Sequence, residues 1–225
     1  ACRLVGCLLH PARHHGEDLR HRVDFGTKCR RETCPEAKVF DRLDTETRAF
    51  WLHLADGLDA FAYSSRSRNP LFRFLNWGPE LLRRVSRDAQ DPVPSAASLK
   101  RTYPVLASRL SPRGWAYPLG RLCALAGPGA LQKADTAEIL EGRLNGLIDR
   151  VRRERPALDP SDAPATHRLP MEREFLDFLR LTAGLRRLAA EEARTLRSRV
   201  DHALEEVAGS VRSRRAGAAP ASTHR

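Results

Sequence analysis

The sequence has few aromatic and few β-branched residues. Aromatic residues make up 6% of the 225 positions, whereas the helix-favouring residues Ala, Leu, Arg and Glu are abundant. Strands are built mainly from β-branched and aromatic residues, so this composition argues against a sheet-dominated fold. With 41% hydrophobic residues the chain can bury the core of one medium or two small domains. We therefore expect a mostly α protein.

Long apolar runs are also absent. No run approaches the roughly 18 residues that a membrane span needs, and no basic segment followed by an apolar one opens the sequence as in a signal peptide. We therefore expect a soluble, cytoplasmic protein. The first residue is Ala1 and the only methionine is Met171. We expect a trimmed chain, or one without its initiator, with residues missing before Cys2.

Lysine is scarce as well. Only four of the 39 basic residues are lysines, so arginine supplies the other 35 and most of the net charge of +11. Positive charge attracts phosphates and anionic surfaces without specifying a fold. The densest basic stretch, residues 66–115, holds ten Lys or Arg against three acidic residues. Nucleic-acid binding through this segment is an alternative function, and it would be weak, salt-dependent and independent of base sequence.

Recognisable catalytic motifs are missing. The sequence contains no GxSxG and no HExxH, and the Gly-Pro-Gly run at 127–129 lacks the Lys-Ser/Thr of a phosphate loop, which predicts a turn. His53 lies near Asp56 on an expected helix, where a lone histidine is usually structural. Cys123 lies among apolar residues, where a thiol behaves as a small core side chain. No catalytic constellation is identified, and whether the protein is an enzyme stays open.

The first forty residues, in contrast, are rich in metal-binding side chains, with four of the five cysteines and four of the eight histidines. Cys2 and Cys7 enclose four residues, as do Cys29 and Cys34. Two such pairs suit a closed tetrahedral thiolate site, because each pair supplies two ligands from one turn. We predict a metal site with these four cysteines as ligands, and with His10 able to replace one of them.

The identity of the metal is left open by the spacing. Zinc suits a closed thiolate site, whereas an iron–sulfur cluster also uses four cysteines, and Cys34-Pro35 resembles the Cys-Pro ending of ferredoxin motifs. Basic neighbours such as Arg3 and Arg30 would favour the thiolate form that binds metal. Scattered reduced thiols and the disulfides of an exported protein are the other interpretations.

The run formed by Cys2, residues 7–11 (CLLHP) and Cys29-Arg30 resembles the second half of the zinc- or iron-chelating cysteine-cluster domains of many uncharacterised bacterial proteins. In that family a cysteine precedes a short hydrophobic strand, a second cysteine is followed by apolar residues, and a Cys-Arg comes later. The resemblance implies a bacterial metal-binding protein, or an iron–sulfur protein in electron transfer or a modification reaction. The family's cysteine-rich N-terminal half is absent here, and the gap to Cys29 is longer.

The organisation expected from these patterns is a loop-rich metal-binding module over 1–43, followed by an α-helical domain over 44–211. Within that domain, 88–98 is a candidate linker and the proline-broken segment 103–129 predicts short helices joined by turns. A disordered basic tail is expected over 212–225. The periodic apolar segments predict helices over 45–62, 71–77, from Pro79 onward, over 135–154 and over 171–213.

The long C-terminal helix carries an apolar stripe from Leu185 to Val211 that must be covered. Two arrangements are open. The stripe meets another protein surface, with self-association as the simplest case, or it packs on the helices at 45–62 and 135–154 of the same chain. In either case the helical domain would serve interaction or assembly.

Overall fold

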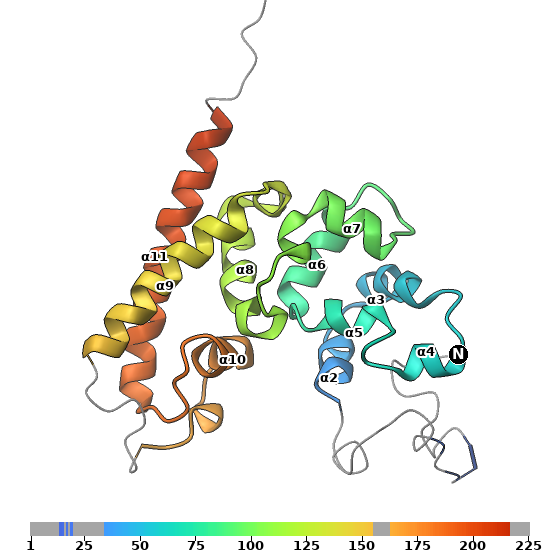
Figure 1. Ribbon diagram of the computed structural model, residues 1–225, viewed down its shortest axis with the longest axis horizontal. Helices are drawn as coiled ribbons and strands as arrows, with labels where there is room; N and C mark the ends of the chain where they lie inside the picture. Colours follow the sequence, from blue (N-terminus) through green and yellow to red (C-terminus); the bar gives the residue numbers. More distant parts are fainter. Residues whose placement is uncertain (1–13, 16, 18, 20–33, 155–162, 217–225) are drawn as a thin grey trace, which may run out of the picture. The chain divides into compact units, whose positions relative to one another are not determined.

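The fold is built from helices. The computed structural model describes residues 14, 15, 17, 19, 34–154 and 163–216, and over these residues the chain is mostly helical and contains no strand (Figure 1). The mostly α class predicted from composition is confirmed. The chain divides into two compact units, residues 1–99 and 100–225. The division follows directly after the predicted linker at 88–98.

The N-terminal unit consists of short helices with polar caps. Asp44 accepts the N–H of Thr47 at 2.8 Å, and Asp59 accepts the N–H of Ala62 at 2.7 Å. Both bonds satisfy backbone donors that have no partner inside the helix. The elements are α2 (Pro35–Asp41), α3 (Thr45–Leu52), η3 (His53–Ala55), α4 (Ala60–Ser64), α5 (Pro70–Leu75) and α6 (Pro79–Asp88), followed by α7 (Ala96–Thr102) at the division between the units.

Trp51 is the centre of the core of this unit. Its side chain is completely buried, and its indole N–H donates to the carbonyl of Leu82 on α6 at 3.2 Å. The ring also packs on Phe74 of α5, with 5.3 Å between the centroids. A buried indole needs a partner for its N–H, so this contact fixes α3 against α6 as well as filling space.

The single helix predicted over 45–62 is wrong, because the chain turns at Asp56 and Gly57. Gly57 adopts a φ of +75°, a conformation that glycine reaches at little cost, and the helical hydrogen bonding ends before it. Asp59 then caps the separate helix α4. Phe61, which belonged to the predicted apolar face, is 43% exposed as a result.

The C-terminal unit is organised around one buried helix, α8. Helices α10 and α11 both pack on α8, and α9 packs along α11 (Figure 1). The predicted helix over 135–154 is confirmed as α9. The elements are η4 (Pro104–Ala107), α8 (Pro112–Ala126), η5 (Pro128–Gln132), α9 (Thr136–Glu154), η6 (Thr166–Arg168), α10 (Arg173–Leu181) and α11 (Ala190–Ala216).

Helix α8 runs without interruption through Pro118, so the prediction that prolines break 103–129 into short helices fails at this position. Proline has no N–H and cannot donate to the carbonyl four residues earlier, which here is that of Gly114. The hydroxyl of Thr182 donates to this carbonyl at 3.0 Å instead. Gly114 permits the approach, because a Cβ at this position would lie 2.5 Å from the Thr182 oxygen.

The helix predicted over 171–213 is also wrong, since it is two helices joined by residues 182–189. Gly184 adopts a φ of +76°, and the N–H of Leu185 turns back to the carbonyl of Leu179 at 2.8 Å. The connector then pairs with the chain at the start of η6, where Thr166 donates its N–H to the carbonyl of Arg186 at 2.9 Å. Tertiary hydrogen bonds therefore replace the helical ones across this break.

The apolar stripe of the C-terminal helix is buried inside the unit. Leu196, Val200, Leu204 and Val211 are each no more than 6% exposed, and they face α8 and α9. Of the two arrangements left open by the sequence, the structure has the stripe covered by its own chain, with α8 in a role that the sequence did not predict. Helix α11 continues to Ala216, five residues into the predicted tail, and residues 217–225 lie outside the described part.

None of the helices in the described ranges combines the length and the apolar character needed to cross a membrane.

We predict that the bond between Thr182 and Gly114 contributes measurably to stability. Thr182→Val keeps the shape of the side chain but leaves a buried carbonyl without a donor, so the free energy of unfolding should fall by about 1–2 kcal/mol in chemical denaturation. Thr195→Val is the matched control, because the Thr195 hydroxyl bonds Glu191 on the exposed face of α11 and its loss should change little. Equal effects of the two substitutions would contradict this role for Thr182.

Candidate functional site

Most of the predicted metal ligands lie outside the residues that the structure describes. Cys2, Cys7, His10 and Cys29 lie outside the described residues, so the structure neither brings them together nor separates them. Cys34 is the one ligand candidate within the described part. Among those residues, no group of three or more His, Cys, Asp or Glu side chains is close enough to hold a metal ion.

Cys34 stands immediately before α2, where its surroundings favour the protonated thiol. Its Sγ donates a hydrogen bond to Glu36 at 2.5 Å, and burial, this bond and the negative charge of Glu36 raise the pKa of the thiol to about 11. A metal ion would have to displace the proton that this bond uses, since the thiolate is the ligating form.

Glu36 ties the start of α2 to the segments around α5 within the N-terminal unit. It is 1% exposed and accepts hydrogen bonds from Arg66 and from Asn76, the latter at 3.1 Å. Burial opposes its ionisation, but the hydrogen bonds from Cys34, its own backbone N–H, Arg66 and Asn76 outweigh burial and lower its pKa. A buried carboxylate held in this way fixes the backbone around Cys34.

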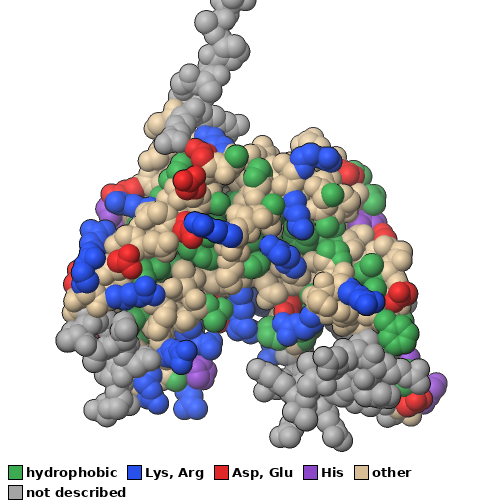
Figure 2. Space-filling view, viewed as in Figure 1, with side chains coloured by type: hydrophobic (Ala, Val, Ile, Leu, Met, Phe, Trp, Pro, Cys, Tyr) green, Lys and Arg blue, Asp and Glu red, His purple; other side chains and the backbone are tan. Residues whose placement is uncertain are grey.

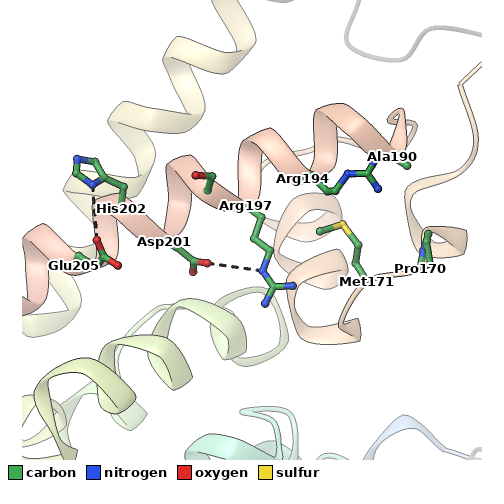
Figure 3. A pocket seen from close by; sticks show the side chains of 9 residues that line it. Pro170, Met171, Ala190, Arg194, Arg197, Asp201, His202 and Glu205 are labelled. Atoms are coloured by element: carbon green, nitrogen blue, oxygen red, sulfur yellow. Dashed lines mark ion pairs between the residues drawn. The ribbon is translucent and has the colours of Figure 1, made fainter.

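A groove of about 650 Å³ in the C-terminal unit is the larger of two notable hollows there. One wall is the segment before α10, with Pro170 and Met171, and the other is the first half of α11 (Figure 3). Arg197 and Asp201 of α11 point toward one another in the close-up, and His202 points toward Glu205. The lining is therefore mixed in charge.

Asp201 accepts hydrogen bonds from α8 as well as lining the groove. The Tyr117 hydroxyl donates to it at 2.6 Å and the Arg121 guanidinium at 3.2 Å. Arg197 bonds Glu172 at 2.9 Å and lies over the rings of Tyr117 and Phe175. Burial alone would lower the pKa of Arg197, but the bond to Glu172 and the neighbouring charges raise it.

This cluster stabilises helix packing and offers no reactive group. Burial and the bond to Asp201 raise the pKa of Tyr117, so the phenol keeps its proton and is a poor nucleophile. His202 is largely exposed and lies 3.8 Å from the carboxylates of Glu205 and Glu206. Neither arrangement places a base beside a nucleophile.

The second hollow, of about 530 Å³, is basic. Among the residues that the structure describes, it is lined by Ala165, His167, Arg180, Leu181, Arg186 and Arg187, and none of these carries a carboxylate. Sequence reasoning missed it because its residues come from η6, the end of α10 and the connector after α10. The only signal in the sequence was Gly184, whose turn returns the chain to η6.

The predicted basic segment 66–115 is partly neutralised by carboxylates. Half of its ten basic residues form ion pairs with carboxylates, most of them from outside the segment. The pairs are Arg66–Glu36, Arg83–Asp44, Arg84–Glu80, Arg109–Glu141 and Arg113–Asp177. Much of the positive charge of this stretch therefore holds helices together.

The remaining candidates have local structural roles. His53 and Asp56 form a surface pair, with 2.7 Å between Nδ1 and Oδ2, and neither residue lines the two hollows. Cys123 is fully buried on α8, as its apolar neighbours predicted. Gly127 ends α8 with a φ of +80°, which confirms a turn rather than a phosphate loop.

Comparison with known proteins gives no match: no family model, no curated protein and no solved structure is significantly similar to this chain.

We predict that the bond between Tyr117 and Asp201 makes stability fall at alkaline pH. The raised pKa in the folded state means that the stabilisation is complete below the ordinary tyrosine pKa of about 10 and is lost as pH rises above it. The free energy of unfolding of the wild type should therefore fall more steeply above pH ~10 than that of Tyr117→Phe. Parallel pH profiles of the two proteins would contradict this prediction.

Proposed function

We propose that this protein binds a metal ion through Cys2, Cys7, Cys29 and Cys34, with His10 as a substitute ligand, and that its helical units carry this module for interaction or assembly. The observation that supports it is the repeated spacing of the four cysteines within 34 residues. The fifth cysteine, Cys123, is buried in α8 and serves the core. Cysteine use is therefore divided between a ligand-rich segment and ordinary packing.

Zinc is the metal that we propose. Four thiols, with an imidazole nearby, match the ligands of closed structural zinc sites, and bound zinc would hold the turns of this segment together. The Cys34-Pro35 pair, which favoured an iron–sulfur cluster, has a local explanation. Pro35 occupies the first turn of α2, where proline is common because its missing N–H would have no partner there. The main argument for iron is thereby weakened.

The attachment of Cys34 suits a structural role for the metal. Its carbonyl accepts the N–H of Lys38 in the first turn of α2, and Glu36 beside it is fixed by Arg66 and Asn76. Because Cys34 lies at the ordered start of α2, it would limit the conformations of the turn that precedes it. The module would then be held to the N-terminal unit at one defined point.

Metal analysis of the full chain tests the proposal. We expect about one zinc per chain for the wild type, and loss of most of it in Cys7→Ser and in Cys29→Ser, because each removes one ligand of four. Cys123→Ala is the matched control, since it removes a cysteine from the core, and it should keep its zinc. Zinc content that is equal in all four proteins would refute the site. Visible absorbance together with bound iron would show that the site holds an iron–sulfur cluster and not zinc.

We further predict that metal removal affects the N-terminal segment alone. The first forty residues have few large apolar side chains and cannot bury enough surface to stay folded without a metal. A chelator should expose residues 1–33 to protease while far-ultraviolet circular dichroism changes little, because the described helices have cores of their own. Unchanged cleavage of residues 1–33 after chelation would count against coupling of metal and fold.

A further inference from the structure

The charged side chains of the larger hollow are ordered along its length. We call this hollow, between the segment before α10 and the first half of α11, the α11 groove (Figure 3). Arg194 and Arg197 line it nearer the start of α11, and Asp201 and Glu205 line it further along the helix. On the face of the molecule shown in Figure 2, acidic and basic side chains are interspersed. In the α11 groove the two signs are separated instead.

The basic end of the α11 groove retains donors for an anion. Arg194 bonds Glu191 through Nε and Nη2. Arg197 bonds Glu172 through Nη2, so neither of these contacts uses the Nη1 atom of the guanidinium. The pair of Arg194 with Glu191 is largely exposed on both sides and therefore contributes little to stability. With the exposed hydroxyl of Ser198, which also lines the groove, these groups can bind a carboxylate.

The acidic end of the α11 groove retains acceptors for a cation. The two donors that reach Asp201 from α8, Tyr117 and Arg121, both bond its Oδ1 atom. Its Oδ2 atom lies 3.8 Å from Nε of Arg197, which is longer than a hydrogen bond. The carboxylate of Glu205 is 58% exposed on the same helix. Asp201 Oδ2 and Glu205 can therefore accept from an ammonium or guanidinium group.

The spacing of the two ends indicates the length of the ligand. The basic end is centred near residue 196 and the acidic end near residue 203, which are about 10 Å apart at the helical rise of about 1.5 Å per residue. Three residues of an extended peptide also span about 10 Å, whereas the charges of a single amino acid lie much closer together. The opposite wall carries Pro170 and Met171 and suits an apolar side chain between the two charges. A nucleic acid would place phosphates against Asp201 and Glu205.

We propose that the α11 groove binds an extended peptide segment of a partner protein that carries a carboxylate and, about three residues away, a lysine or arginine. The carboxylate, of a chain terminus or of an Asp or Glu side chain, binds Arg194, Arg197 and Ser198. The cation binds Asp201 and Glu205. This site rests on the interaction role proposed for the helical units and not on the metal.

Fluorescence anisotropy of the full chain with labelled peptides tests this proposal. The probe is the amide of fluorescein-Gly-Lys-Ala-Leu-Glu, in which the two charged side chains have the required spacing. Arg194→Glu should weaken its binding about tenfold, because a charge-assisted contact becomes a repulsion. The same variant should change little for a probe with Gln in place of Glu. Glu205→Lys should likewise weaken binding of the first probe and change little for a probe with Gln in place of Lys.

Arg150→Glu and Glu138→Lys on α9 are the matched controls, because both residues are exposed, lie outside the groove and change the net charge equally. Circular dichroism of each variant checks that the helices are retained. Equal losses in the controls would show attraction by net charge alone and would overturn the site. Equal binding of a probe with adjacent Lys and Glu would do the same, as would the absence of binding at about 1 mM protein.

A probe with a free C-terminus, fluorescein-Gly-Lys-Ala-Ala-Leu, identifies the source of the carboxylate. Tighter binding than that of the first probe assigns the groove to a chain terminus, and weaker binding assigns it to an Asp or Glu side chain. A metal chelator should leave these affinities unchanged, so that failure of the metal site and failure of the groove are separate results. Loss of binding after chelation would move the contact to the metal-binding module and overturn the groove.

Discussion

The contact between Thr182 and Gly114 determines how the C-terminal unit is assembled. Pro118 deprives the Gly114 carbonyl of its helical donor, and the Thr182 hydroxyl replaces that donor from outside the helix. The replacement requires α10 to end close against α8, which only a residue without a side chain at position 114 allows. The turn at Gly184 follows from there and returns the chain to η6.

Arginine has two different uses in this unit. Around Asp177 and Asp201 it neutralises carboxylates between α8, α10 and α11, and these pairs join helices whose apolar faces are already buried. Partly buried pairs of this kind cost desolvation energy, so their value lies as much in fixing the relative register of helices as in net stability. Arg187 has a different use, because its guanidinium donates to the carbonyl of Ala163 and ties the connector after α10 to the segment before η6.

The sequence predicted the elements whose causes are local. The helical class, α9, the helix from Pro79 and, with shifted bounds, the helix predicted over 71–77 follow from composition, apolar periodicity and caps, all of which act over a few residues. The breaks were harder to predict. Gly57 and Gly184 are compatible with a helix, and only the tertiary contacts around them decide that the chain turns there. The continuity of α8 through Pro118 depends on a hydroxyl 64 residues away, which no local pattern contains.

The same distinction applies to the cysteine cluster and to the basic hollow beside η6. Cysteine ligands can be predicted from a sequence because each turn of such a metal site supplies a pair of ligands. The spacing of the cysteines therefore indicates the site. The basic hollow has no such spacing, since His167 and Arg187 are brought together by a bridge between segments about twenty residues apart and by the turn at Gly184. Its residues were counted in the sequence only as part of the overall charge. Net charge predicts attraction to phosphate but not where on the protein it acts. A hollow of this kind becomes visible only in the fold, because the bridge between Ala165 and Arg187 joins segments that no local pattern brings together.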